Sequence, residues 1–363
     1  MGVSCSQSKY STYKKYPRLV KEFKSGQVFA NGLFKIELQF TGELEEVWKV
    51  QDKSNYAIYS LHERNKADLI KSKCLYNLVI RENKIMACLS SNFILNVHNS
   101  FQEEIALYRT SDYIAGRLSF YMSQNYVFSN EELRYIAASI ILGLEYLSSK
   151  KVIHRNLRPE NIFITPNGKV KIGGFLYSRE YNETMSNSMD SIGTAGYMAP
   201  EIIEKQNHDP LLDLYGLGIV LYEAATLRKL FEDTNPEKVL TKMATFKVEK
   251  KGFPAMYSED LVHLINRLLQ FKPRRRIGAG GFDEIKSHKW FENFDWAGLK
   301  NGKLQPPFEP EFEERDTLGN SQKKKVNYSL IRNPSIQSLF IGYQFGIDCV
   351  STRGSKEFEN NIV

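Results

Sequence analysis

The residue types with the most chemical potential are gathered between residues 152 and 176. A histidine, an arginine and an amide follow one another at 154–156, and a second amide stands at Asn161. Asn156 has no basic site, so it cannot take a proton from a substrate hydroxyl. The run GGFL at 173–176 places Gly174 after a short strand-like segment, and a glycine offers no carboxylate oxygen to a hard cation. The stretch therefore predicts a polar loop between two short strands (161–165 and 169–172), without a general base or a complete metal site.

The composition predicts an ordered globular protein. With 363 residues, 42% of them hydrophobic and 25% charged, the chain can bury one sizeable core or two lobes. Its four cysteines are scattered without disulfide or metal-ligand spacing, which favours a reducing intracellular compartment. The apolar runs near 136–147 and 214–225 are too short to span a bilayer, and the polar N-terminus does not resemble a secretory signal.

The N-terminus carries three signals for membrane attachment. It begins MGVSCS, which matches the myristoylation pattern at Gly2, and Cys5 could take a palmitoyl chain beside it. Six basic residues and one acidic residue follow by position 24. A second acyl chain or a basic patch makes the marginal binding of one myristoyl chain stable. We expect residues 1–30 to hold the protein at the cytoplasmic face of an anionic membrane; the alternative is a frayed basic tail.

The elements that position the polar loop change type along the chain. Strand-like runs at 33–40, 46–51, 56–61, 93–101 and 105–110 surround one helical run at 75–89. From Ser129 the pattern is helical, because Ser129 and Glu132 form a capping-box sequence before a run to about 149. Further helices are predicted at 210–227, 236–246, 258–271 and 281–287. The order predicts an α+β protein of two lobes, followed from residue 295 by a Pro-rich, charged tail.

These motifs, in their order, resemble the protein kinase family, and within it the AGC group of serine/threonine kinases. HRNLRPEN at 154–161 resembles H-R-D-L-x-x-x-N, GTAGYMAPE at 193–201 resembles G-T-x-x-Y-x-A-P-E, and DLYGLG at 213–218 resembles D-x-W-x-x-G. RRRIG at 274–278, LQPPFEP at 304–310 and FIGYQF at 340–345 are similar to the AGC lobe end, tail and hydrophobic motif. The resemblance covers residues 33–345. It implies a bilobal fold with a small β-rich N-lobe (31–113), a large helical C-lobe (114–294, closing the domain 31–294) and a tail (295–363).

The resemblance implies that the nucleotide-binding parts are degenerate. Aligned on Val47, the three glycines of the phosphate loop fall at Phe40, Gly42 and Glu45, so one glycine remains. The lysine of V-A-I-K becomes Tyr59, two residues after Ala57. Its helix partner, identified as Glu82, would then lose its ion pair and turn to solvent or to another donor such as the Tyr59 hydroxyl.

The resemblance implies that the catalytic base and a magnesium ligand are lost as well. Asn156 replaces the aspartate that accepts the substrate proton, and Gly174 replaces the magnesium-binding aspartate of D-F-G, while the magnesium ligand Asn161 is retained. Arg158 replaces the loop lysine. Arg117 replaces an acidic residue that contacts ribose and basic substrates, which would repel a basic substrate. We expect no metal site.

Other matching residues imply a preserved scaffold. His154 and Phe175 match members of a packed spine, with Met86 as a third, and Arg276 is expected to pair with Glu201. Asp190 stands at the activation-loop phosphosite, where it could pair with Arg155; the alternative is a solvated side chain. Structural residues in the prediction are Glu82, His154, Arg155, Phe175, Asp190, Glu201, Asp213 and Arg276. In the tail, Phe340 and Tyr343 are expected to dock on the small lobe without phosphorylation, because Gln344 replaces the usual serine or threonine.

These losses predict a membrane-tethered pseudokinase, which is not an enzyme and acts as a scaffold or allosteric partner in signalling. Its partners would be proteins and an anionic membrane, with covalent myristate and palmitate, and no nucleic acid. The alternative is an atypical serine/threonine kinase with residual ATP binding and weak transfer. An intermediate reading has ATP bound without magnesium by Gly42, Val47, Ala57, Asn161 and the hinge near 108–112.

Overall fold

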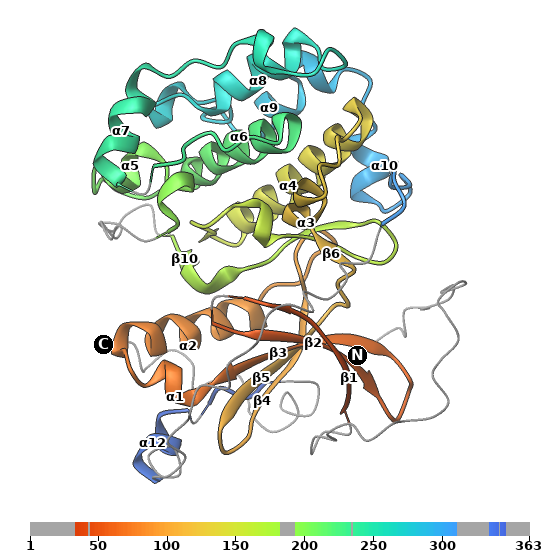
Figure 1. The fold of residues 1–363 in the computed structure, drawn as a ribbon, viewed down its shortest axis with the longest axis vertical. Coiled ribbons are helices and arrows are strands. Elements are labelled where there is room, and N and C mark those ends of the chain that lie inside the picture. Colours follow the sequence, from red (N-terminus) through yellow and green to blue (C-terminus); the bar gives the residue numbers. More distant parts are fainter. Residues whose placement is uncertain are drawn as a thin grey trace, which may run out of the picture.

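The structure is a computed structural model that describes residues 33–42, 44–181, 193–233, 235–310, 334–340 and 342–345. In this part the chain forms two lobes, one built on a sheet and one on helices (Figure 1). Gly2, Cys5 and Asp190 lie outside the described residues. The predicted α+β, bilobal architecture is confirmed.

The small lobe contains a five-stranded antiparallel sheet in the order β1-β2-β3-β5-β4. Two helices accompany it, and the longer one, α2, begins at the Ser72 cap and lies between the sheet and the large lobe (Figure 1). The elements are β1 (Leu33–Thr41), β2 (Glu46–Asp52), β3 (Ile58–Asn65), α1 (Lys66–Leu69), α2 (Lys73–Ala87), β4 (Val97–Gln102) and β5 (Ala106–Ser111).

Strand β3 is longer than the sequence pattern indicates. The predicted strand ends at Leu61, whereas β3 continues to Asn65 and pairs with β2 and β5 along its length. The polar run from His62 to Asn65 resembles a loop in the sequence, but buried partners on both neighbouring strands keep it in the sheet. This difference decides which side chains face the large lobe, because alternate residues of a strand point to opposite faces.

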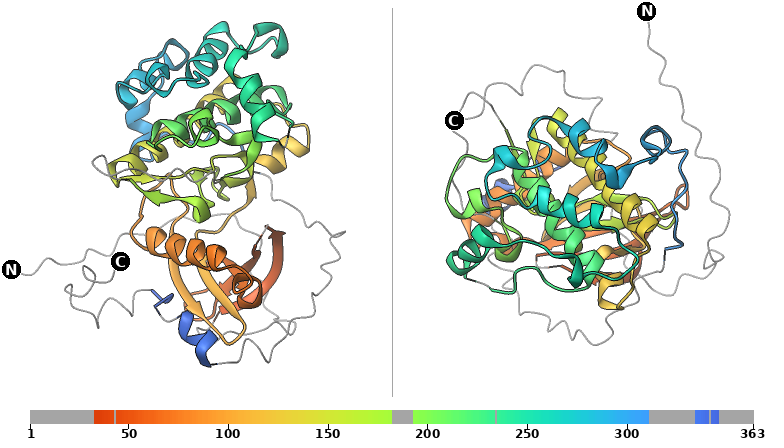
Figure 2. Two further views of the ribbon diagram at one scale, coloured as in Figure 1. Left: turned by 90° about the vertical axis from the view of Figure 1, so that its left-hand side faces the viewer. Right: turned by 90° about the horizontal axis from the view of Figure 1, so that it is seen from above.

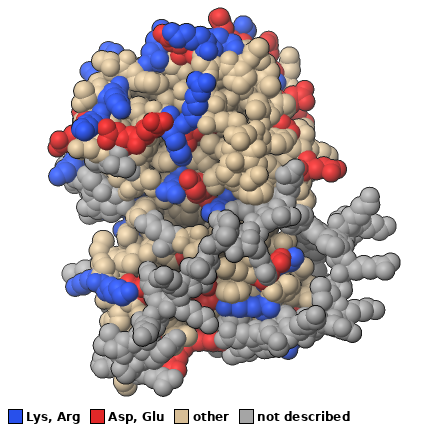
Figure 3. Space-filling view, viewed as in Figure 1, with Lys and Arg blue, Asp and Glu red and all other residues tan. Residues whose placement is uncertain are grey.

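The large lobe is organised around two buried helices, α4 (Asn130–Ser149) and α6 (Leu211–Thr226). Apolar residues surround α6 on every side, as in a helix at the centre of a lobe. The capping box at Ser129 and Glu132 is present and opens α4 as predicted. None of the helices in the described ranges is long and apolar enough to cross a membrane. Lys and Arg lie among Asp and Glu on the face of this lobe drawn in Figure 3.

Short elements complete the large lobe. Strands β6 (Gly116–Arg117), β8 (Ile162–Ile164) and β9 (Val170–Ile172) form one small sheet, and β7 (Val152–Ile153) pairs with β10 (Arg179–Glu180). The other helices are α3 (Leu118–Ser123), α5 (Pro200–Ile203), α7 (Pro236–Thr245), α8 (Glu259–Leu268), α9 (Phe282–Lys286) and α10 (Trp296–Lys300), with 3₁₀ turns η1 (Pro159–Asn161), η2 (Phe175–Tyr177), η3 (Ala195–Tyr197), η4 (Lys250–Gly252), η5 (Pro273–Arg275) and η6 (Lys289–Phe291).

The C-terminal segment returns to the small lobe. Helix α12 (Pro334–Leu339) lies at the end of the small lobe that is remote from the large lobe, as both Figure 1 and the left view of Figure 2 show. Phe340 and Tyr343 are buried against α1, α2 and β5. The Tyr343 carbonyl accepts a hydrogen bond from the Ser100 hydroxyl at 2.6 Å. The predicted docking of these two aromatic residues is confirmed.

Candidate functional site

One carboxylate of the large lobe, that of Asp213, binds the backbone of the polar loop at 153–161. Asp213, in the first turn of α6, accepts the backbone N–H groups of His154 at 2.7 Å and Arg155 at 2.8 Å. Arg155 has a φ of 63°, a left-handed conformation that is uncommon for a residue other than glycine. The two bonds to Asp213 hold the loop in this conformation, so the structure places Asp213 where the predicted scaffold role requires it.

His154 is a packing residue. Its ring is fully buried and meets the edge of Phe175, with centroids 4.9 Å apart. Nε2 lies 2.8 Å from the Gly173 carbonyl, which can only accept, so we assign the proton to Nε2. Burial lowers the pKa of His154 to about 4, although the Gly173 bond opposes the shift. Met86 from α2 belongs to the same apolar cluster, as the predicted spine requires.

On the side of the expected protein substrate, three side chains form a chain of hydrogen bonds. The Thr194 hydroxyl donates to Asn156 Oδ1 at 3.2 Å and accepts from Arg158 Nη1 at 2.7 Å. Asn161 Nδ2 donates to the Asn156 backbone carbonyl at 2.8 Å. These contacts fix the Asn156 amide relative to the 193–201 segment. An amide fixed in this way can orient a hydroxyl group, but it cannot deprotonate one.

The residues at the expected metal site do not fit magnesium. Gly174 has a φ of 74°, and a Cβ added to it would lie 2.3 Å from Asn161 Oδ1. Asn161 therefore fills the space in which an aspartate at position 174 would place its side chain. Across the described ranges, no group of three His, Cys, Asp or Glu side chains could hold a metal ion.

The predicted replacement of the strand lysine by Tyr59 is wrong. Tyr59 packs with Val50 and Leu61 on the face of the sheet opposite to α2, and its ring meets His98 with centroids 5.3 Å apart. Ser60, His62 and Arg64 alternate onto the other face of β3, where Arg64 contacts Glu82 of α2. The length of β3 explains the error. The strand continues past Leu61, where the predicted strand ends, and this additional part contains Arg64.

Ala57 and Val47, two other predicted nucleotide contacts, lie at different places in the small lobe. Ala57 lies in the turn before β3, where its carbonyl accepts from the Asp52 N–H at 2.9 Å, so its assignment to the site is also wrong. Ser60 lies beside the segment that connects the two lobes, because its hydroxyl accepts a hydrogen bond from the Ile114 N–H at 3.2 Å. Val47 is buried opposite His62 in the β2–β3 pair, and its contact with a nucleotide stays a prediction.

Glu82 does not turn to solvent. Of the two predicted outcomes the structure shows the second, another donor, although the donors are two arginines and not the Tyr59 hydroxyl. The Glu82 carboxylate is fully buried and meets two guanidinium groups: Arg64 Nη1 contacts Oε2, and Arg109 Nη1 lies 2.9 Å from Oε1. Burial opposes the ionisation of Glu82, but these two cations keep its pKa below the ordinary value. Arg64 is thus the strand cation that pairs with Glu82, in the role expected of the missing lysine.

A second carboxylate reaches the same two arginines. Glu45 Oε2 lies 2.8 Å from Arg64 Nη2 and 2.9 Å from Arg109 Nη2, and Oε1 lies 3.0 Å from His62 Nδ1. We call Glu45, His62, Arg64, Glu82 and Arg109 the arginine cluster. Burial opposes the charge on Glu45, yet the two arginines hold its pKa well below the ordinary value; burial lowers the pKa of His62 although Glu45 opposes it. His62 is therefore neutral at pH 7.

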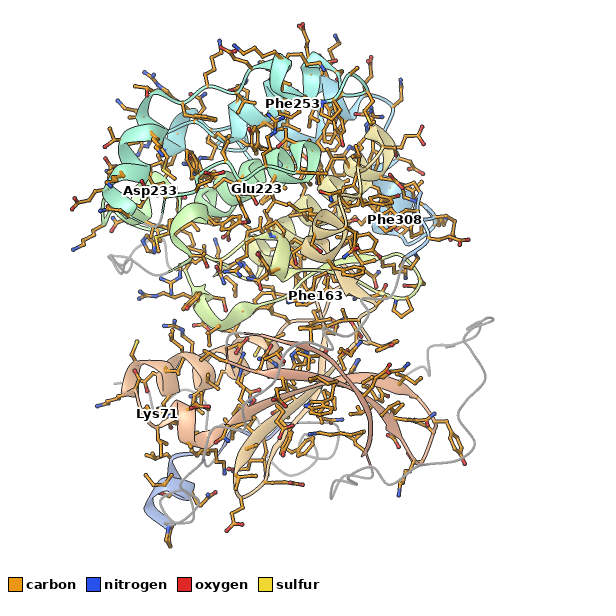
Figure 4. All side chains as sticks on the ribbon, viewed as in Figure 1. Lys71, Phe163, Glu223, Asp233, Phe253 and Phe308 are labelled. Carbon is orange, nitrogen blue, oxygen red and sulfur yellow. The ribbon has the colours of Figure 1, made fainter. Side chains whose placement is uncertain are left out.

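Beside the arginine cluster, an aromatic contact joins the two lobes. The ring of Phe40 stacks on Phe163 of β8, with centroids 6.3 Å apart, and packs with Leu95 and Ile114. Figure 4 labels Phe163 at the lower edge of the large lobe, facing the small lobe. The Arg117 guanidinium lies 4.2 Å from the Phe40 ring centroid. Phe40 and Glu45 occupy two expected glycine positions on either side of Gly42. Phe40 contacts the large lobe, whereas Glu45 contacts the arginines of the small lobe.

The arginine cluster is not among the sites predicted from the sequence. Its signal was present in β5, where all six residues from Ala106 to Ser111 are buried and Arg109 interrupts the apolar run. A buried arginine requires a carboxylate partner, because an unpaired buried charge is costly. The sequence could have indicated that such a partner exists, although not which residue provides it.

Arg155 makes contacts other than the predicted one. Its Nε donates to the Tyr177 carbonyl at 2.7 Å, and its Nη1 lies 3.4 Å from His208 Nδ1. The pairing with Asp190 stays a prediction, because Asp190 lies outside the described residues.

Comparison with known proteins places this geometry in context. The family of proteins with a protein kinase domain matches residues 41–291. A probable serine/threonine-protein kinase of Dictyostelium discoideum is 30% identical over 313 residues, which cover 84% of this chain and 68% of that protein. Serine/threonine-protein kinase AtPK1/AtPK6 of Arabidopsis thaliana is 33% identical over 298 residues, covering 81% and 63%. Human ribosomal protein S6 kinase alpha-1 is 29% identical over 273 residues, covering 73% and 37%.

These relatives correct one expectation from the sequence. The losses at Asn156 and Gly174 led to the prediction of a protein that is not an enzyme. The Dictyostelium and Arabidopsis relatives, however, are named as serine/threonine-protein kinases, and other relatives are named as a protein kinase catalytic subunit and as S6 kinases. The comparison points to an enzyme. The resemblance to serine/threonine kinases of the AGC type is supported, since the relatives include S6 kinases and a cAMP-dependent protein kinase catalytic subunit. The chain spans less than two thirds of the Arabidopsis relative and about a third of the human one.

Proposed function

Because the chain belongs to the protein kinase family, we propose that it is an atypical serine/threonine protein kinase, which transfers a phosphoryl group slowly from ATP to a protein hydroxyl. The observation that carries this proposal is the hydrogen-bonded arrangement of Asn156, Thr194 and Arg158. Phosphoryl transfer depends mostly on positioning and electrostatics, because its transition state is loose and involves little covalent chemistry by the protein.

Each side chain of this arrangement has a role in the proposal. Asn156 Oδ1, already an acceptor for Thr194, receives the hydrogen bond of the substrate hydroxyl and directs its oxygen. Arg158 keeps a positive charge beside that oxygen, next to the expected path of the transferred phosphoryl group. The absence of a base at position 156 makes transfer slow, by about 10²–10⁴-fold relative to a site with a carboxylate.

Positive charge for the ATP phosphates comes, in this proposal, from Arg64 and Arg109. The support is their position on the small-lobe strands that face the large lobe, on the same sheet face as Val47. Because the residues near Gly174 do not fit magnesium, we propose binding of ATP without that ion. ATP then acts as the phosphoryl donor: the bond between its γ-phosphorus and the β–γ bridging oxygen breaks, ADP leaves, and the substrate oxygen forms the new bond to phosphorus. Because Asn156 cannot accept the hydroxyl proton, that proton passes to an oxygen of the transferred phosphoryl group. Proteins with accessible serine or threonine hydroxyls act as partners and substrates.

The test is phosphate transfer by the purified full chain from γ-labelled ATP to a mixed library of serine, threonine and tyrosine peptides. We expect slow labelling of serine and threonine, unchanged by EDTA. Asn156→Asp restores a base and should raise the rate by about 10²–10⁴-fold. Asn167→Asp is the matched control, since it makes the same exchange in the turn before β9. Transfer that stays at background in both the wild type and Asn156→Asp would contradict the proposal.

The proposal extends to the location of the protein. Gly2 with a myristoyl chain, Cys5 with a palmitoyl chain and the basic residues after them support attachment to the cytoplasmic face of an anionic membrane. Gly2→Ala should move the protein from the membrane fraction to the soluble fraction. Val3→Ala leaves the pattern intact and should change nothing. Equal membrane fractions for wild type and Gly2→Ala would contradict this part of the proposal.

A further inference from the structure

We propose that His62, Arg64 and Arg109 form a binding site for the phosphate groups of a polyphosphate ligand, and that Glu45 occupies this site as an internal competitor. The inference rests on the proposed function in one respect, namely that ATP is the natural ligand. It adds a regulated state to the site: the ligand binds only when the Glu45 carboxylate leaves.

The geometry at Glu45 is that of a bound anion. Its Oε2 receives Nη2 of Arg64 at 2.8 Å and Nη2 of Arg109 at 2.9 Å, so two guanidinium groups converge on one oxygen. Oε1 is close to His62 Nδ1 at 3.0 Å. A phosphate oxygen is bound by arginine through the same charge-assisted contacts, and it accepts several donors at once.

Glu45 and Glu82 play different parts in the cluster. Glu82 comes from α2, is fully buried, and uses the Nη1 atoms of both arginines. Glu45 comes from the turn between β1 and β2, and its side chain is 18% exposed. The Nη2 atoms therefore point to the more accessible side of the cluster. Glu82 holds the arginines in place, and Glu45 covers the donors that a ligand would use.

The charge balance explains why the site needs an anion. Arg64 and Arg109 carry two positive charges, which Glu82 and Glu45 together neutralise while His62 is neutral. When the Glu45 carboxylate leaves, one positive charge remains without a partner in a largely buried place. An unpaired charge there is costly, so the displaced state favours an anionic ligand.

The turn that carries Glu45 also links the site to the contact between the lobes. The Gly42 N–H donates to the Glu45 carbonyl at 2.7 Å, which closes the turn. Phe40, at the other side of Gly42, stacks on Phe163 of the large lobe. Glu45, which contacts the arginines, and Phe40, which contacts the large lobe, therefore belong to one short segment of the chain.

The experiment measures binding of inorganic tripolyphosphate and of ATP to the full chain by isothermal titration calorimetry without magnesium. Glu45→Gln removes the competing charge and should bind both ligands about tenfold more tightly than the wild type. Glu46→Gln, the matched control, removes the same charge one residue along. In the β2–β3 register Glu46 pairs with Glu63, which lies on the opposite face of β3 from Arg64, so the control should leave both affinities unchanged. Arg109→Ala added to Glu45→Gln should abolish the gain.

A second variant protects the test against loss of folding. Glu45→Asp keeps the negative charge but shortens the side chain by one methylene group, so it should fold and gain a few-fold in affinity. If neither Glu45→Gln nor Glu45→Asp binds tripolyphosphate more tightly than Glu46→Gln, Glu45 is a structural ion-pair partner and the inference is wrong. Binding is measured without peptide, so a chain that gains affinity but transfers no phosphate overturns only the proposed function.

Discussion

Arg276 and Glu201 face each other through two parallel hydrogen bonds in the interior of the large lobe. Nη1 lies 2.8 Å from Oε1 and Nη2 lies 3.1 Å from Oε2, and the two side chains are 0% and 2% exposed. The guanidinium also donates to the carbonyls of Leu211 and Gln270. The pair connects α5, which follows the segment 193–199, to the start of α6, whose Asp213 holds the polar loop. The pairing predicted from the sequence is thereby confirmed.

Glu201→Ala should lower the free energy of unfolding by about 3–5 kcal/mol, because it leaves a buried guanidinium without its carboxylate. Urea denaturation followed by tryptophan fluorescence measures the change. Glu249→Ala is the control, since Glu249 pairs with Lys251 at the surface and its loss should not be measurable. A loss for Glu201→Ala no larger than that for Glu249→Ala would contradict a stabilising role for the pair.

The scaffold of the large lobe could be predicted because its motifs are short and continuous. His154, Asn156 and Asn161 keep family spacing within eight residues, so their relative positions follow from the loop alone. Asp213 and Arg276 stand in motifs of their own, at the start of α6 and after α8. Their partners across the lobe follow once the family is known.

The arginine cluster could not be predicted in the same way. Its members come from the turn before β2, from β3, from α2 and from β5, and each contact joins residues far apart in the sequence. Local patterns contain no information about which buried charges meet. The assignment of Tyr59 failed for a related reason: the face on which a strand residue lies depends on register, which the neighbouring strands determine.

Phe340→Ala should lower the free energy of unfolding of the small lobe by about 3–5 kcal/mol, as expected for an aromatic side chain removed from a well-packed site. Phe340 is fully buried beside Leu69, Val79 and Leu107, and the edge of Tyr76 meets its ring. Hydrogen exchange along α2 should become faster at the same time. Leu339→Ala, at a side chain that is 44% exposed, should change neither quantity. Identical behaviour of the two variants would show that the tail does not dock in solution.

Gly174→Ala should destabilise the protein, for two separable reasons. The φ of 74° costs a residue with a Cβ about 1–2 kcal/mol, and the new Cβ collides with the Asn161 amide. Asn161→Ala removes the colliding atoms, so the double variant should be more stable than the sum of the single changes predicts, by about 0.5–3 kcal/mol. Chemical denaturation of the four proteins gives this coupling. Gly280→Ala is the control, because no atom lies closer than 3.6 Å to its Cβ position. Strict additivity would show that Asn161 does not fill the space beside Gly174.

His154 should make the protein less stable in mild acid. Burial lowers its pKa to about 4 in the folded chain, whereas the unfolded chain has the ordinary value of about 6.5. Between these values the unfolded state binds a proton that the folded state does not bind. The stability that His154 contributes is therefore complete above pH 6.5 and is lost as the pH falls toward 4.

The measurement compares wild type with His154→Gln, whose amide can still donate to the Gly173 carbonyl. From pH 7 to pH 5 the free energy of unfolding should fall by about 2 kcal/mol more in the wild type than in the variant.

Two other groups also change the stability over this pH range. Burial raises the pKa of Asp213 to about 7 despite its two backbone bonds, and this shift changes the stability with the opposite sign to that of His154. His62 titrates with the same sign as His154. Both groups are present in the two proteins, so the difference between the pH profiles isolates His154. Parallel profiles would mean that His154 titrates alike in the folded and unfolded chains. That result would contradict the burial of its ring against Phe175.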